Sequence, residues 1–431
     1  MTSGHPPTPL PRSVWLLSWV SFFADVSSEM VYPLLPLFLV GVLGSSKVQL
    51  GLIEGAAVLL VAALSAYAGF RSDARRRRLP WIRWGYGLPI LGKATIALAT
   101  AWPMVLSGRL LDRLGKGLRG APRDAMLSDA ISTDQRGRAF GLHRAFDTAG
   151  ALLGVVLSAV LLWWLTGFPQ ASQASTQAPA WVYRSIFAIG AALGAASLVL
   201  TLLLRETTQT DVPTDRMPPR DRSAPALPRR YWLALGALGL FALGNSSDAF
   251  LLLRAAELGF SPWTVVLAYA MFNVTYSALS YPVGLLSDRL GRWRVICLGW
   301  AIYACVYTGF ALLPHTQAWG VWPLMAAYGL YMAMTDGVGK ALIADCTPPQ
   351  RRGAAMGLFH MCNGLATLVA SVLAGLAWDR WGPAPAFLIG AAAASASIVA
   401  VLALHRVGML NPTPDDGPAA GACESRVTPP V

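Results

Sequence analysis

The chain has 431 residues, of which 55% are hydrophobic and only 13% are charged. A soluble domain carries about a quarter charged residues, so this composition excludes an ordinary soluble enzyme and predicts a polytopic membrane protein. The net charge of +12 sits in arginine clusters beside apolar segments, which indicates a topology signal rather than nucleic-acid binding.

The apolar segments divide the chain into two sets of six. We predict an N-terminal tail over 1–13, a six-helix bundle over 14–204, a polar linker over 205–230, a second six-helix bundle over 231–406 and a C-terminal tail over 407–431. The expected spans are 14–43, 50–70, 80–100, 102–127, 138–165, 181–204, 231–256, 263–286, 293–313, 319–346, 353–378 and 384–405. The sequence therefore predicts an all-α membrane protein with twelve transmembrane helices.

Arginine placement predicts the orientation of these spans. The connectors after the even-numbered spans are rich in arginine, whereas the other connectors hold few cations apart from Lys47 and Arg380. Cytoplasmic loops carry an excess of Lys and Arg, so we expect both termini in the cytoplasm. The expected location is the bacterial inner membrane.

Three short motifs of the first half recur in the second half at nearly constant offsets. They are Asp129-to-Gly137 and Asp345-to-Gly353, 216 residues apart; Gly69-x-x-x-Asp73 and Gly284-x-x-x-Asp288, 215 apart; and Ser27-Ser28-Glu29 and Ser246-Ser247-Asp248, 219 apart. Such a duplication is typical of alternating-access transporters, whose site lies between the two bundles near the bilayer midplane.

Two acids of the first span lie at the depth where such a site is expected. Asp25 and Glu29 are one helical turn apart, roughly 16 to 22 Å along the span in a core ~30 Å thick. Two carboxyl groups that are close together and removed from water cannot both carry a charge at low cost. At least one of them is therefore expected to bind and release a proton. Alternatively, Arg109, Arg113 or Lys93 neutralises them. Asp248, the repeat counterpart of Glu29, is assigned the same proton-coupling role.

The fourth span carries a charged stripe. Arg109, Arg113, Lys116 and Arg119 recur about once per turn, with Asp112 among them. Charges at membrane depth are costly unless they face water, a partner or a substrate. A positive cavity wall suits an anionic or zwitterionic substrate. The alternative is a locked ion network with acids such as Asp112, Asp124, Asp147 and Glu54.

Other polar residues of the spans complete the predicted cavity. On the fifth span, His143 and Asp147 suggest a proton relay or a packing pair, with Arg144 beside them. On the tenth span, Asp336 and Lys340 are one turn apart and either face the cavity or pair with each other. The opposite wall is expected to include Tyr328, Tyr331 and His360.

The repeated motifs resemble those of the major facilitator superfamily along essentially the whole chain. The superfamily signature Gly-x-x-x-Asp-Arg-x-Gly-Arg-Arg is nearly complete from Gly284 to Arg294 and degraded from Gly69 onward, where Ala74 replaces the first Arg. The resemblance implies a conformational latch formed by the residues Gly69, Asp73, Arg77, Asp129, Arg136, Gly284, Asp288, Arg289, Arg292, Asp345 and Arg352. The stretch from Asp25 to Pro33 is similar to a bacterial branch of the family.

The same resemblance gives Arg109 a role. In similar antiporters an arginine of the fourth span assists proton transfer, although Arg113 stands where their motif has glycine. The resemblance implies a fold of two pseudo-symmetric six-helix bundles and a monomer in the lipid bilayer.

The expected function is secondary active transport of a small solute, with proton-coupled efflux of an anionic or zwitterionic compound or drug. The alternatives are a proton symporter or facilitator for uptake of a small anionic metabolite, and a membrane enzyme acting on lipid phosphate. The sequence carries no phosphate-binding loop, dinucleotide-binding pattern or metal-binding motif, so we expect no cofactor, no metal and no catalytic residues. The expected partners are protons and a small-molecule substrate, without nucleic acid.

Overall fold

A computed structural model describes residues 10–75, 78–131, 135–167, 178–206, 226–348 and 351–407, together with Met409. The first half contains α1 (Arg12–Val31), which continues through two short distorted turns, η1 (Tyr32–Leu34) and η2 (Leu37–Val42). The helices that follow it are α2 (Lys47–Arg75), α3 (Leu79–Ala97), α4 (Trp102–Asp129), α5 (Arg136–Thr166) and α6 (Ala180–Leu202).

The second half contains one more helix than the sequence predicts. Its helices are α7 (Arg229–Ala242), α8 (Ala249–Glu257), α9 (Pro262–Leu290), α10 (Arg292–Leu312), α11 (Val321–Asp345), α12 (Arg352–Trp381) and α13 (Pro383–Arg406), with a short turn η4 (His315–Gly320) before α11. The continuous seventh span expected over 231–256 is wrong, because α7 and α8 are separated by an irregular segment, 243–248.

Seven of the described helices are long and apolar enough to cross a membrane. They are α1 with η1, α2, α5, α6, α10, α12 and α13. The remaining long helices carry more polar or charged residues, and several of them surround the cavity described below. The fold is an all-α membrane fold in which about twelve helices, some of them distorted or broken, correspond to the predicted spans.

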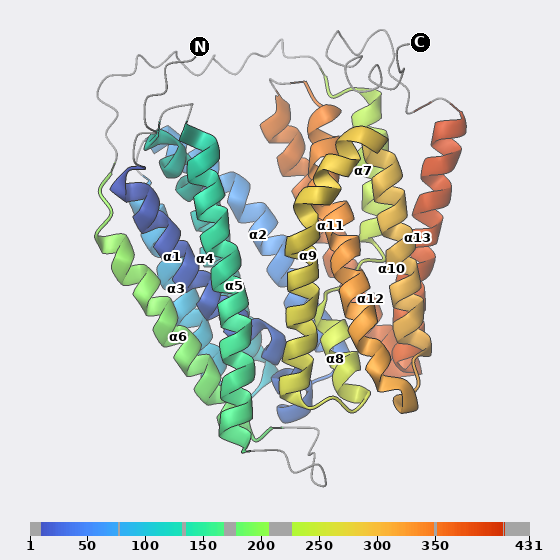
Figure 1. The fold of residues 1–431 in the computed structure, drawn as a ribbon, viewed down its shortest axis with the longest axis horizontal. Coiled ribbons are helices and arrows are strands. Elements are labelled where there is room, and N and C mark those ends of the chain that lie inside the picture. The colour runs from blue at the N-terminus through green and yellow to red at the C-terminus, as the bar shows by residue number, and fades with distance from the viewer. Residues whose placement is uncertain are drawn as a thin grey trace, which may run out of the picture.

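Figure 1 shows the helices in two groups, with α1–α6 in blue to green and α7–α13 in yellow-green to red. We call the end at which α1 begins and α13 ends the terminal face, and the other end the opposite face. Two helix pairs join the groups: α2 packs against α12, and α5 packs against α9.

Glycines allow backbone contact where α2 meets α12. A side chain at Gly51 would run into the backbone of Ser371, and one at Gly375 into the backbone of Lys47. These positions lie at the start of α2 and near the end of α12, so the two halves are closed together at the opposite face. Gly150 and Gly154 likewise place α5 against the backbone of α1, so these two glycines serve close helix packing.

Candidate functional site

A cavity of about 860 Å³ lies between the two halves and is lined by residues of both. From the first half come Glu29, Tyr32, Glu54, Arg113 and Lys116, and from the second come Asn245–Asp248, Tyr269, Tyr331, Asp336, Lys340 and His360. Its lining also includes Gly353 at the start of α12 and Ser65 in the second half of α2, but not the first turns of α2. The cavity therefore extends from the terminal face to about the level of Glu54.

Two acids at the deep end of this cavity are each held by a tyrosine. The hydroxyl of Tyr269 donates to Oε2 of Glu29 at 3.0 Å, which joins α9 to α1 across the two halves. The hydroxyl of Tyr328 donates to Oδ1 of Asp248 at 2.6 Å. Neither acid forms an ion pair with another described residue. The sequence left open that Arg109, Arg113 or Lys93 neutralises Glu29. Among the described residues, none of these three cations forms an ion pair with Glu29.

Arg109 makes a different contact from the one expected for a free proton-coupling group. Its Nε and Nη2 donate to the two carboxylate oxygens of Glu54 at 2.9 and 2.8 Å, and both side chains are buried. The guanidinium also lies 5.1 Å from the ring centroid of Tyr32. Such a bidentate ion pair holds both side chains in one geometry. Glu54 faces the cavity and Arg109 lies behind it.

The pair continues into a buried ion network between α3 and α4. Asp112 lies 3.2 Å from Nζ of Lys93 and 3.7 Å from both Arg109 and Arg113. Asp112 is therefore an internal partner of these cations and does not line the cavity. This arrangement matches the locked network considered from the sequence for Arg109 and Asp112.

Two cations of α4 remain at the cavity wall. Arg113 lines the cavity while its Nε approaches Asp112, and Lys116 lines it as an exposed side chain. Lys116 has no hydrogen bond or ion pair to any described residue. The first half thus presents both cations and carboxylates to the cavity.

The second half presents an aromatic wall and an interrupted span. Trp300, Phe241 and Tyr331 line the cavity, with Trp300 stacked on Phe241 at 5.0 Å between ring centroids. Between α7 and α8 the irregular segment Leu243–Asp248 brings several polar side chains to the cavity surface. The hydroxyl of Ser371 accepts the backbone N–H of Ser247 at 3.1 Å, which holds part of this irregular backbone in place.

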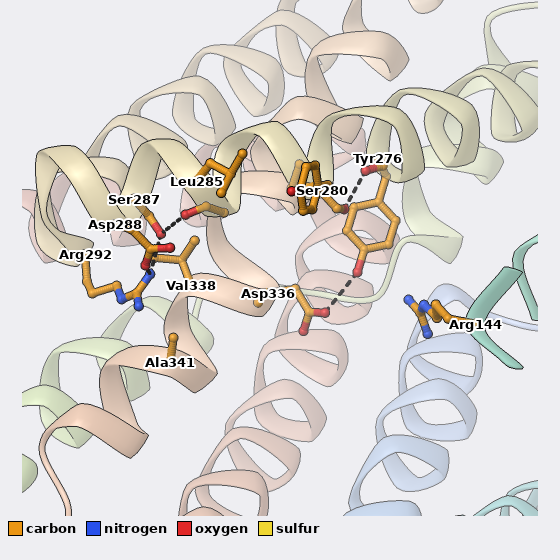
Figure 2. Close-up of a pocket in the computed structure, with 14 residues that line it drawn as sticks. Arg144, Tyr276, Ser280, Leu285, Ser287, Asp288, Arg292, Asp336, Val338 and Ala341 are labelled. Carbon is orange, nitrogen blue, oxygen red and sulfur yellow. Dashed lines mark hydrogen bonds and ion pairs between the residues drawn. The ribbon is translucent and has the colours of Figure 1, made fainter. Parts of the chain in front are cut away.

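Asp336 lies where the main cavity meets a second pocket of about 490 Å³. Lys340 pairs with it at 2.8 Å, and the hydroxyl of Tyr276 donates to it at 2.9 Å. Figure 2 shows Arg144 on the far side of this second pocket, with its guanidinium turned towards Tyr276 and Asp336. Arg144 belongs to α5, so the second pocket also lies between the halves.

Three further candidates from the sequence lie in α1 and α5, outside the lining of both cavities. His143 is 4% exposed, and its Nε2 lies 3.7 Å from Oδ1 of Asp147. The charged groups acting on Asp25 are Asp147 together with Lys116, Arg119 and Arg123. The structure therefore separates Asp25 from Glu29: only Glu29 reaches the cavity.

The predicted latch residues of the second half come together at the terminal face. Arg292 pairs with Asp288 at 2.6 Å and with Asp345 at 3.3 Å, and its Nη1 donates to the hydroxyl of Ser287 at 2.6 Å. Arg289 and Arg352 are exposed there, and Gly284 lines the second pocket.

In the first half, Asp129 pairs with Arg78 at the matching position. Arg77, and the side chains at Gly69, Asp73 and Arg136, lie outside the described part of the chain.

Sequence reasoning missed several cavity residues, of which Glu54 and Tyr269 make the contacts described above. Glu54 entered it only as a possible partner of Arg109, although an acid in an otherwise apolar span is a signal in itself. Tyr269 carried no such signal, because its importance comes from a contact with Glu29, 240 residues away.

Comparison with known proteins agrees with this architecture. The family model described as Major Facilitator Superfamily matches residues 17–337 and 255–424. An MFS-type transporter of Methanocaldococcus jannaschii is 31% identical, covering 88% of this chain and 92% of its own length. The multidrug resistance protein MdtH of Salmonella arizonae is 24% identical, covering 81% of this chain and 82% of its own length.

Among solved structures, the nucleoside transporter NupG matches with a TM-score of 0.71 and 14% identity, covering 92% of this chain and 99% of its own. The family match spans both halves and the cavity between them, so the chain is a multi-pass membrane transporter and not an enzyme. It belongs to the major facilitator superfamily.

Proposed function

We propose that the protein exports a small zwitterionic or anionic compound in exchange for protons. The observation that carries the proposal is that the cavity is lined by charges of both signs. Glu29 and Asp248, one from each half, line it without ion pairs to described residues, and Arg113 and Lys116 of α4 line the same cavity. A zwitterion offers a partner to both kinds of charge.

The two acids suit proton coupling for a physical reason. A carboxylate held at membrane depth without a cation is costly, so it is stabilised either by a proton or by the positive group of a substrate. Binding of one then competes with binding of the other, which is what antiport requires. Arg109 supports the site indirectly, because it fixes Glu54 beside the two acids.

The direction and setting are part of the same proposal. Similarity to the multidrug resistance protein MdtH favours efflux. We place both termini on the cytoplasmic side of the inner membrane, which agrees with the arginines at the terminal face. We also propose that a monomer is sufficient, since the cavity is built from one chain.

The test uses purified protein in liposomes loaded with a pH-sensitive dye. Norfloxacin as a zwitterion, ethidium as a cation and salicylate as an anion serve as probes. The proposal expects proton movement driven by norfloxacin in the wild type, and a loss of at least tenfold in Glu29→Gln and Asp248→Asn. Asp124→Asn is the matched control, because Asp124 is exposed and does not line the cavity.

Unchanged proton movement in both cavity variants would contradict the proton role. Accumulation of the probe along a proton gradient directed into the vesicle would replace antiport by symport. Movement of salicylate alone would restrict the substrate to anions. Glu29 and Asp248 would then bind protons but not the substrate.

A further inference from the structure

The latch motif of the second half occurs again at the other face of the molecule. Gly284-Leu-Leu-Ser-Asp288-Arg289-Leu-Gly291 recurs 91 residues later as Gly375-Leu-Ala-Trp-Asp379-Arg380-Trp-Gly382. The final glycine closes the helix in both copies, with φ of 91° at Gly291 and 87° at Gly382. Because α9 and α12 run in opposite directions, one copy lies at the terminal face and the other at the opposite face.

The second copy is engaged with the other half of the molecule. The two carboxylate oxygens of Asp379 accept the backbone N–H groups of Lys47 and Val48, each at 3.1 Å. These are the first residues of α2, whose N–H groups have no partner within their own helix. Asp379 therefore caps α2 from α12, and its negative charge faces the positive end of the α2 dipole.

The surrounding contact leaves no room between the two helices. Gly375, in the same motif as Asp379, lies against the backbone of Lys47, and Gly55 lies against the backbone of Leu368. Further along α2, Val58, Val61 and Ser65 line the cavity instead. Opening of the opposite face must separate the start of α2 from the end of α12, and it must break the cap.

The first copy is in the reverse condition. Asp288 is exposed and pairs with Arg292 of its own half. The hydrogen bonds and ion pairs of Asp288 in the described residues stay within the second half. The cavity extends outward at this face. The copy with Asp379 therefore bridges the two halves at the closed face, whereas the copy with Asp288 makes no such bridge at the face where the halves are apart.

We propose that Asp379 is a latch residue of the opposite face, which stabilises the state in which that face is closed and the cavity is reached from the terminal face. The inference rests on the two halves separating at either face in turn. It does not depend on the substrate or on the coupling ion.

Pulsed electron spin distance measurements on the full chain test the latch. The native cysteines are replaced, and spin labels are attached to Thr100→Cys and Thr316→Cys, which are exposed at the opposite face on different halves. A second label pair, Gly141→Cys and Gly353→Cys, reports on the terminal face at positions where an added side chain meets open space.

Loss of a helix cap changes an equilibrium about fivefold. We expect Asp379→Ala to raise the ratio of open to closed opposite-face distances by about this factor. Asp379→Asn keeps one acceptor oxygen but loses the charge and one N–H partner, so it should raise the ratio by less than Asp379→Ala. The terminal-face distances should shorten in the same samples, because the two halves move as bodies. Asp379→Glu, which keeps the charge, should fall between wild type and Asp379→Asn.

The matched control is Asp288→Asn, which changes the same motif position at the other face and should not widen the opposite face. Wild-type distances at both faces in Asp379→Asn and Asp379→Ala would overturn the proposal. Equal widening by Asp288→Asn and Asp379→Asn would also overturn it, since the effect would then be general loosening. Proton movement in the liposome assay is a separate readout, so failure of the latch and failure of the proposed antiport are distinguishable.

Discussion

At the scale of single residues, the deep end of the cavity combines a neutralised acid with two acids that lack cations. Glu54 forms an ion pair with Arg109, whereas Glu29 and Asp248 each accept a hydrogen bond from a tyrosine hydroxyl. A tyrosine hydroxyl offers a hydrogen bond but no compensating charge. This difference is why we propose a structural role for Glu54 and a proton-coupling role for Glu29 and Asp248.

The Arg109–Glu54 pair makes a testable prediction about stability. Arg109→Met leaves Glu54 buried without its partner, and breaking such a buried pair costs about 3–5 kcal/mol. The double variant Arg109→Met with Glu54→Leu removes both charges and should recover most of the loss. Thermal unfolding in detergent compares the three proteins. A double variant as unstable as the single variant would contradict the account.

A further residue-scale prediction concerns the contact between Glu29 and Tyr269. Tyr269→Phe removes the hydroxyl and keeps the ring, so Glu29 loses its partner in the second half. A hydrogen bond to a charged group contributes about 1.5–3 kcal/mol, so we expect the free energy of unfolding in detergent to fall by about this amount. Tyr281→Phe is the control, because Tyr281 is 75% exposed and does not line the main cavity.

Only part of the site could be predicted at this scale. Charge at membrane depth pointed to Glu29, Arg113 and Lys116, and all three line the cavity. The partner of Arg109 could not be derived, because Glu54 is 55 residues away and helix periodicity places residues only on their own helix. Asp25 and Glu29 share one helix, yet neighbouring helices decide that only Glu29 reaches the cavity.

At the scale of elements, the interruption between α7 and α8 has a local cause. The segment Gly244-Asn245-Ser246-Ser247-Asp248 consists of residues with low helix propensity, and Ser, Asn and Asp compete for backbone hydrogen bonds. Hydropathy alone predicted one continuous span there. Irregular backbone at membrane depth is tolerated where it lines a cavity, which is its position here.

The interruption makes a prediction about Ser371. This buried residue accepts the N–H of Ser247, so Ser371→Ala leaves that N–H without its partner at a cost of about 1–3 kcal/mol. Ser397→Ala is the matched control, since the equally buried Ser397 hydroxyl only donates to a carbonyl of its own helix. Thermal unfolding should show a clearly larger loss for Ser371→Ala. Equal losses would contradict this role.

At the scale of the whole molecule, the sequence predicted an all-α membrane fold in two sets of helices, because apolar segments of about twenty residues alternate with arginine-rich connectors. The spans that fall short of the apolar criterion include α4, α9 and α11, which contribute to the cavity wall. Some of their polar residues line the cavity, as Arg113 and Lys116 of α4 do, and others belong to the buried ion network, as Arg109 and Asp112 do. Which face is closed could not be predicted, because one sequence must support both arrangements.

The glycines between α2 and α12 set a limit on how far this sequence can vary. At Gly51, Gly55 and Gly375 any added side chain would act as a wedge between the two helices, whereas Gly120 and Gly357 stand in open space. A library of all substitutions, sorted for retained transport, should therefore lose nearly every variant at the first three positions and keep many at the other two. The permeability barrier of this protein depends on the smallest residues it contains.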